Sequence, residues 1–430
     1  MPDYKKKKHN RLLSSPGKPK KNKRVKEDFD EDIKMTPSPA RKKPSPQQSG
    51  MKVVKGKKLE QKRKFKVFSV TVVIVLVVVM VLQLILPAGI IETVSNSLSL
   101  LGSGSYPIEL ESTETINAVS YGSYYYVLTN SYINAYNSSG KELFSHAHGF
   151  EKPIIKTSSS RAIVFNQGGN SALIFNQSGL KETITTEKEI ITAAISDSGA
   201  YAFSTLSDKY TSAVTVYSKR NKVLYEWFSA ENTINNVAIA PNGKKIAVSG
   251  FNSSIGKYKS IVSVLNYKSA TPEYTENFEG SLIYNIDTSA QRGFTIVSAN
   301  KILFVKWSNL KKQEYANDYN LSHYKAGKNG SVAVFNRESD KTDNKIEVYT
   351  KSGERKAEFS YKGIISDIQV FGNHIYCMSE TDIYLLSDSG EVLRTASCGF
   401  GAVRMVVTGT NNVAVITDNE IEKIKLEQEQ

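Results

Sequence analysis

The sequence predicts an all-β protein: a β-propeller of about eight four-stranded blades, preceded by one transmembrane helix and a disordered basic N-terminal tail. Three observations predict this fold. From about Tyr106 onward, short runs rich in Val, Ile, Tyr and Phe alternate with turn residues, without an amphipathic stretch of helix length. These runs recur with a mean period of about 41 residues, the length of one propeller blade. An uncharged apolar segment at 67–86 separates them from a Lys-rich N-terminus.

The repeats define eight first strands. A propeller needs about four strands in every 40 to 50 residues. Successive centres are separated by 36, 39, 43, 49, 38, 44 and 37 residues. We therefore expect eight blades, with seven as the alternative. The first strands centre near Val119, Ile155, Ala194, Val237, Ile286, Tyr324, Ile368 and Met405.

A hairpin with a Ser-Gly turn recurs inside these units. Tight turns need a residue with positive φ, and Gly140, Gly179, Gly353 and Gly390 supply it. The segment 214–227 is the same hairpin without its glycine. The glycine-containing hairpins are INAYNSSGKELF at 133–144, LIFNQSGLKETI at 173–184, IEVYTKSGERKAEF at 346–359 and IYLLSDSGEVLRTA at 383–396.

The two ends of the repeat region predict how the ring closes. The last unit, from residue 401, supplies about three strands before the charged C-terminus. The segment YPIELES at 106–112 is the candidate for the missing outer strand. Closure by strands from both ends would pair sheet edges that otherwise invite aggregation.

The apolar segment predicts a membrane anchor. Its twenty residues would span roughly 30 Å as a helix, the thickness of a bilayer's hydrocarbon core. An uncleaved signal-anchor is favoured over a cleaved signal peptide, whose apolar region is shorter and lies nearer the start. The predicted domains are a disordered cytoplasmic tail at 1–66, the transmembrane helix at 67–91, a Ser/Gly-rich linker at 92–105 and the propeller at 106–430.

A basic cluster precedes the apolar segment and sets its orientation. Segment 52–66 holds eight basic residues and one acid, whereas no base follows the helix before Lys141. The positive-inside rule places the N-terminus in the cytoplasm and the propeller outside a cell membrane that the chain crosses once. The cluster is a topology signal, and binding to anionic lipid headgroups is the alternative. Its membrane-flanking bases are Lys57, Lys58, Lys62, Arg63, Lys64 and Lys66.

The net charge of +14 belongs to the tail. Residues 1–66 contain 23 Lys and Arg against 7 Asp and Glu, which leaves 33 basic and 35 acidic residues for 67–430. The part of the chain that folds is nearly neutral. This charge distribution disfavours a nucleic-acid-binding domain.

Candidate chemical groups are sparse. Cys377 and Cys398 would fall in the second and fourth strands of one sheet, roughly 9 to 10 Å apart, so we expect two free, mostly buried thiols rather than a disulfide. His146 and His148 have the spacing of a two-histidine metal half-site but lack a third ligand. The tyrosines of 120–136 are expected to pack between blades, with a ligand platform as the alternative. We predict no metal, no cofactor and no catalytic residues.

The strand, Ser-Gly turn, strand hairpins resemble the repeats of quinoprotein-type propellers, and APNGKKIAV at 240–248 resembles the repeat of TolB-type and WD40-like propellers. The whole layout of basic tail, single helix and Tyr- and Ser-rich propeller resembles uncharacterised Gram-positive bacterial membrane proteins classed under a domain of unknown function. The resemblance implies a fold and a location. It supplies no catalytic motif.

These observations favour a non-enzymatic role: a membrane-anchored extracytoplasmic propeller that binds a protein or an envelope polymer as a scaffold. Two alternatives stay open. The first is an extracytoplasmic enzyme, which acidic side chains converging from three or more blades in a central pocket would favour. The second is a transmembrane sensor or tether, in which the tail engages a cytoplasmic partner.

Overall fold

The computed structural model describes residues 68–74, 100–111, 114–121, 123–158, 161–254, 257–288 and 292–428. Residues 68–74 are helical and belong to the predicted membrane segment. Among the described residues no helix has the length and apolarity needed to cross a bilayer. The predicted tail, the basic cluster before the helix and most of the apolar segment lie outside the described residues.

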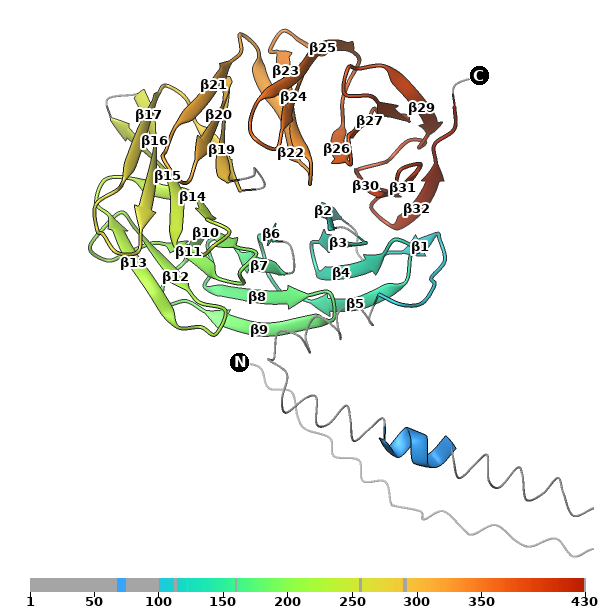
Figure 1. The fold of residues 1–430 in the computed structure, drawn as a ribbon, viewed down its shortest axis with the longest axis horizontal. Helices are drawn as coiled ribbons and strands as arrows, with labels where there is room; N and C mark the ends of the chain where they lie inside the picture. The colour runs from blue at the N-terminus through green and yellow to red at the C-terminus, as the bar shows by residue number, and fades with distance from the viewer. Residues whose placement is uncertain are drawn as a thin grey trace, which may run out of the picture. The chain divides into compact units, whose positions relative to one another are not determined.

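The described part after residue 100 forms eight antiparallel four-stranded sheets around a common centre (Figure 1). This confirms the prediction of eight blades rather than seven. Each predicted first-strand centre falls within the first strand of a blade.

The first four blades contain, in order, β2 (Thr115–Tyr121), β3 (Tyr124–Thr129), β4 (Tyr132–Asn137) and β5 (Glu142–Ala147); β6 (Pro153–Thr157), β7 (Ala162–Asn166), β8 (Ser171–Asn176) and β9 (Gly179–Thr185); β10 (Ile190–Ile195), β11 (Tyr201–Thr205), β12 (Ser212–Tyr217) and β13 (Val223–Ser229); and β14 (Thr233–Ile239), β15 (Lys245–Ser254), β16 (Lys257–Asn266) and β17 (Tyr274–Glu279).

The other four contain β18 (Ile283–Asp287), β19 (Gly293–Ser298), β20 (Lys301–Lys306) and β21 (Lys312–Ala316); β22 (Asn320–Ala326), β23 (Gly330–Arg337), β24 (Asp340–Thr350) and β25 (Arg355–Lys362); β26 (Asp367–Phe371), β27 (His374–Met378), β28 (Asp382–Leu386) and β29 (Val392–Ser397); and β30 (Arg404–Gly409), β31 (Asn412–Ile416), β32 (Glu420–Lys425) and β1 (Ile108–Glu109).

Burial along each strand follows its position in the blade. Second strands are covered on both faces by the neighbouring blades, and all six residues of β3 are buried. Outer strands alternate between exposed and partly buried positions, as in β25. The apolar core is therefore divided into eight clusters, one between each pair of neighbouring blades, in the part of the chain that is described.

The predicted hairpin turns have the expected backbone. Gly140, Gly179, Gly353 and Gly390 all have positive φ, between 84° and 113°. In the hairpin that lacks glycine, Asn221 takes the same place with φ of 60°. Asparagine tolerates this left-handed conformation better than other non-glycine residues, which explains how the turn survives the substitution.

The N-terminal end of the propeller domain closes the ring, as predicted from the segment 106–112. Ile108 and Glu109 of β1 pair with Ile421 and Glu420 of β32, and the Leu110 amide donates to the Asn419 carbonyl. The last blade therefore combines three strands from the C-terminal end with one from the start of the domain.

Residues 100–107 form a strap that leads into β1 and packs on the β4–β5 turn. The Asn137 side-chain amide donates to the carbonyls of Leu100 and Gly102, at 3.1 Å each. The Tyr106 hydroxyl lies 3.1 Å from the Tyr125 hydroxyl. The last residues of the predicted linker, 100–105, thus contact the first blade.

Gly104→Ala tests whether the strap belongs to the cooperative fold. A Cβ atom at Gly104 would collide with the backbone of Gly140 and Lys141. We expect the variant to lose about 1–3 kcal/mol of unfolding free energy, measured by denaturant titration, because the strap carries the closing strand. Gly409→Ala is the control, since a Cβ there meets only the Asn412 side chain at 3.6 Å. Equal stability of the two variants would contradict the prediction.

Candidate functional site

The up-and-down order of the strands sorts the turns of every blade onto two faces of the ring. Turns between first and second strands, and between third and fourth strands, lie on the face where the strap 100–107 arrives. We call this the proximal face. Turns between second and third strands, and the connections from each outer strand to the next blade, form the distal face.

The two faces carry opposite charge. The proximal turns hold eleven basic and five acidic residues, a net charge of +6. The distal turns hold three basic and eleven acidic residues, a net charge of −8. The near-neutral body that the sequence predicts is therefore strongly polarised.

Most proximal bases are not neutralised within the molecule. The proximal acids Glu273 and Asp388 pair instead with Lys245 and Lys356, which lie on strands. Seven exposed bases form no ion pair with any residue that the structure describes. They are Arg220, Lys222, Lys244, Lys268, Arg292, Lys311 and Lys328.

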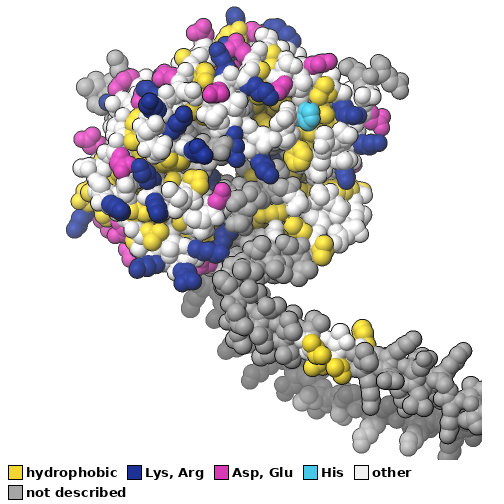
Figure 2. All heavy atoms as spheres, viewed as in Figure 1, with side chains coloured by type: hydrophobic (Ala, Val, Ile, Leu, Met, Phe, Trp, Pro, Cys, Tyr) yellow, Lys and Arg dark blue, Asp and Glu magenta, His cyan; other side chains and the backbone are white. Residues whose placement is uncertain are grey.

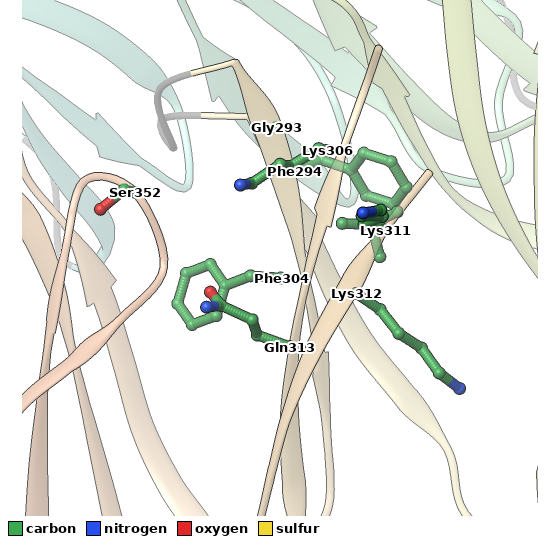
Figure 3. Close-up of a pocket in the computed structure, with 9 residues that line it drawn as sticks. Gly293, Phe294, Phe304, Lys306, Lys311, Lys312, Gln313 and Ser352 are labelled. Carbon is green, nitrogen blue, oxygen red and sulfur yellow. The ribbon is translucent and has the colours of Figure 1, made fainter. Parts of the chain in front are cut away.

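A small cavity of about 170 Å³ opens among these proximal turns. Its basic lining residues are Lys306 of β20, Lys311 of the β20–β21 turn and Lys312 of β21. Ser352 comes from the β24–β25 turn of the next blade (Figure 3). Phe294 and Phe304 supply apolar walls. The Lys312 amine is bound to Glu276 at 2.7 Å, and it points away from Ser352 in Figure 3. Lys306 and Lys311 have no such partner among the described residues.

The distal face carries the exposed aromatic side chains of the propeller. Phe400 is 86% exposed, in the connection between the seventh and eighth blades. It lies between Gly399 and Gly401, both with positive φ and open space where a Cβ would be. The other large aromatics that are exposed in the described propeller are also at distal ends of strands or in distal turns. They are Tyr210, Phe228, Phe251 and Tyr284.

A groove of about 260 Å³ begins beside this aromatic surface, between the third and fourth blades. Trp227, Phe228 and Pro272 line it together with residues of β15 and β16. The Tyr210 ring packs on Phe228, with 5.1 Å between the ring centroids. Exposed aromatic rings beside an apolar groove are typical of surfaces that bind other proteins.

The centre of the ring is lined by the first strands (Figure 1). Figure 2 shows a hollow there, with Lys and Arg side chains around it on the face in view. Lys156 of β6 forms no ion pair with a described residue; burial lowers its pKa, and the Asp287 carboxylate opposes that shift. Asp287 of β18 accepts a hydrogen bond from Tyr324 of β22 at 3.1 Å.

A second group of polar side chains lies on the first strands β22, β26 and β30. Asp367 is buried and accepts from the backbone amides of Ile368 and Met405, at 2.8 and 3.0 Å. Burial lowers the pKa of His323, and nearby Asp367 opposes this shift. Among the described residues, acids of the first strands come from two blades only, at Asp287 and Asp367. Each is held by hydrogen bonds within the ring.

The two histidines noted in the sequence, His146 and His148, make different contacts. The His148 Nε2 lies 3.1 Å from the Thr129 carbonyl, and its Nδ1 accepts from the Phe150 amide at 3.0 Å. Both ring nitrogens are therefore engaged. His146 packs against the Phe175 ring, 5.5 Å between centroids. No group of three or more potential metal ligands is found in the described part of the chain.

The cysteines and tyrosines follow the sequence-based expectation. Cys377 is buried in β27, Cys398 is partly buried after β29, and both are free. Tyr125, Tyr126 and Tyr136 are at most 2% exposed and pack between blades rather than forming a ligand platform.

The membrane-flanking bases cannot be located in the fold. Lys57, Lys58, Lys62, Arg63, Lys64 and Lys66 lie outside the described residues. The proximal bases, in contrast, were not identified from the sequence, because the net charge of the folded part conceals them. Assigning turns alternately to the two faces would have revealed them.

The comparison with protein families finds a match over residues 103–426 to the model described as "Family of unknown function (DUF5711)". This range extends from the strap to the end of the last blade. A comparison with the curated proteins finds no match.

Among solved structures, the C-terminal WD40 domain of Sif2 is similar, with a TM-score of 0.53 and 10% identity over 76% of this chain and 100% of that domain. BamB from Moraxella catarrhalis gives 0.47 and 10% over 75% of this chain and 99% of BamB. Apo AztD from Citrobacter koseri gives 0.46 and 12% over 74% and 90%. At these identities the Sif2 domain supports the propeller fold and nothing further.

The His148 site predicts a pH-dependent stability. Burial lowers the pKa of His148 below its ordinary value of about 6.5, so at lower pH the unfolded chain takes up a proton that the folded state resists. The neutral His148 side chain therefore contributes stability above about pH 6.5, the ordinary value for histidine, and this contribution is lost as the pH falls below it. We expect His148→Gln to reduce the slope of unfolding free energy between about pH 7 and 5, measured by denaturant titration.

The slope should not vanish in this variant, because burial also lowers the pKa of His323. Combining His148→Gln with His323→Gln should flatten the profile further. An unchanged slope in the double variant would contradict the assignment.

Proposed function

The chain belongs to the DUF5711 family of unknown function, and from that premise we propose that it is a single-pass membrane protein whose propeller is a protein-interaction module working through its distal face. The observation that carries this proposal is the concentration of exposed aromatic side chains on one face of a rigid ring. Aromatic groups as exposed as Phe400 bury little apolar surface within the ring. Aromatic residues, phenylalanine among them, are enriched at protein interfaces.

The chemistry of the distal face favours a particular kind of partner. Its turns have a net charge of −8, so a partner with basic side chains around an apolar centre is complementary to it. The groove at Trp227 and Phe228 supplies a recess for such an apolar group. An envelope polymer of negative charge would be repelled from this face, and we therefore favour a protein.

The membrane anchor is part of this proposal and is supported by the sequence. The segment 67–86 is uncharged over twenty residues, and its flanking bases lie on the N-terminal side. We propose that the N-terminus is cytoplasmic and that the propeller is extracytoplasmic.

We further propose a non-enzymatic role. The enzyme alternative calls for acids from three or more blades at the ring centre. The described first strands bring acids from two, Asp287 and Asp367. Asp367 accepts hydrogen bonds from backbone amides of two neighbouring blades, so its carboxylate links these blades.

Substituting the exposed distal aromatics tests the interaction surface. We expect Phe400→Ser combined with Tyr284→Ser to reduce crosslinking of the full-length protein to its partner in the native membrane by roughly tenfold or more, since a lost aromatic anchor weakens binding by about 2 kcal/mol. The readout is quantitative mass spectrometry of crosslinked products.

The matched control is Leu224→Ser combined with Val392→Ser, which removes two exposed apolar side chains from outer strands near their proximal ends. It should leave the crosslinks unchanged. A partner that remains crosslinked to the aromatic variant at wild-type levels would exclude the distal face as its binding surface.

Protease treatment of intact spheroplasts tests the orientation. We expect externally added trypsin to leave the tail 1–66 intact, because the positive-inside rule retains it in the cytoplasm. Antibodies against an epitope at the N-terminus provide the measurement, and permeabilised cells provide the control. Loss of the epitope in sealed spheroplasts would reverse the proposed topology.

A further inference from the structure

The proximal face has the charge and the position of a membrane-binding surface. Its turns hold eleven basic and five acidic residues, and the chain reaches the ring on this face. We propose that the proximal face docks on a bilayer that contains anionic lipids. This inference rests on the proposed membrane anchor and goes beyond it, because an anchor alone leaves the orientation of the propeller undefined.

Seven of the eleven proximal bases are exposed and form no ion pair with a described residue, so they are available for an external anion. Two of the proximal acids already form ion pairs with lysines on strands. The Glu273 carboxylate lies 2.6 Å from the Lys245 amine, and Asp388 pairs with Lys356. Arg220, Lys222 and Lys268 are exposed and have no ion pair with a described residue. A base near an anionic bilayer contributes about 1 kcal/mol within a Debye length of the surface. Several such bases together give a substantial attraction.

The bases are concentrated on one side of the ring. Nine of the eleven belong to turns of the four blades that run from β10 to β25. The strap 100–107 instead lies at the first and last blades, where it contacts Asn137 and leads into β1. The covalent connection and the basic region are therefore on different parts of the proximal face. Two separated attachments would hold the face against a plane, whereas one would let it swing.

The cavity at Lys306 has the groups that a lipid phosphate requires. The Lys306 and Lys311 amines and the Ser352 hydroxyl are hydrogen-bond donors, and ammonium groups bind phosphate through charge-assisted hydrogen bonds (Figure 3). Its volume of about 170 Å³ exceeds what a phosphate group needs but would not take a whole lipid. Phe294 and Phe304 provide apolar walls for the carbon atoms next to the phosphate.

The length of the chain between anchor and ring favours a membrane over a soluble polyanion as the occupant. The apolar segment ends at Leu86, and Leu100 already contacts the first blade. Fourteen residue steps cover at most about 50 Å when fully extended. The proximal face is therefore confined to the neighbourhood of the bilayer at a high effective concentration.

Lysine acylation of the full-length protein in nanodiscs tests the proposal. The discs contain either phosphatidylcholine alone or phosphatidylcholine with about one third phosphatidylglycerol. We expect the reactivity of Lys222, Lys268 and Lys328, measured by mass spectrometry, to fall several-fold in the anionic discs and to recover at about 1 M salt, where charges are screened within about 3 Å. Lys152 and Lys209 on the distal face are internal controls and should not change.

A charge-matched pair of variants tests the cavity. Lys306→Ala with Lys311→Ala should reduce the protection of nearby Lys351 in anionic discs. Lys152→Ala with Lys209→Ala removes the same charge from the distal face and should leave that protection intact. Equal effects of the two double variants would overturn the assignment of the cavity.

The remaining outcomes separate this proposal from the anchor on which it rests. A protein that fails to insert into either disc refutes the anchor. A protein that inserts but shows the same lysine reactivity in both discs refutes the docking surface while leaving the anchor standing. Protection by soluble polyphosphate in neutral discs, without protection by anionic lipid, would identify a polyanion as the ligand and overturn the lipid assignment.

Discussion

The pairing of β1 with β32 is the interaction on which the rest of the ring depends. Every sheet in the propeller buries both faces against neighbours, so an open ring would expose the apolar faces of its two terminal blades. Ile108 and Leu110 place the N-terminal segment in the last blade, and the cluster with Tyr125, Val406 and Ile421 fills the closing interface. A two-residue strand is enough because this apolar cluster stabilises the contact.

The same up-and-down topology explains how a body with almost no net charge presents two strongly charged faces. Consecutive turns along the chain alternate between the faces, so a sequence can place bases and acids in alternate turns. The β12–β13 turn contains Lys219, Arg220 and Lys222, and the next connection contains Glu231. An overall charge count adds these turns together and hides the arrangement. The alternation places a basic surface and an acidic surface on opposite faces of one domain.

Much of the fold was predictable because its determinants are local. Strand runs, turn glycines and the repeat period lie within single blades, and the tyrosines near Tyr125 follow the expected pattern of second strands. Closure by 106–112 was also predictable, because a three-stranded last unit demands a partner. The packing of 100–105 was not, since a Ser/Gly composition does not reveal that Asn137 would bind the carbonyls of Leu100 and Gly102.

The candidate sites were harder to predict because they combine residues from different blades. The cavity joins Lys306 with Ser352 of the next blade, and Asp367 binds the amide of Met405 across a blade boundary. Such contacts depend on how neighbouring sheets are staggered, which the repeat pattern does not specify. The partners of His148 were not predictable either, because the Thr129 carbonyl reaches its Nε2 from β3 while the Phe150 amide donates to its Nδ1.

The separation of the two surfaces has a consequence for any partner. If the strap and the proximal bases both hold the ring to a bilayer, the distal face is directed away from it, and its aromatic groups are presented to molecules outside the membrane. Charge also favours this arrangement, since the acidic distal turns are repelled by anionic headgroups as the basic proximal turns are attracted. The orientation would then follow from the distribution of charge over the ring rather than from any rigid linkage to the anchor.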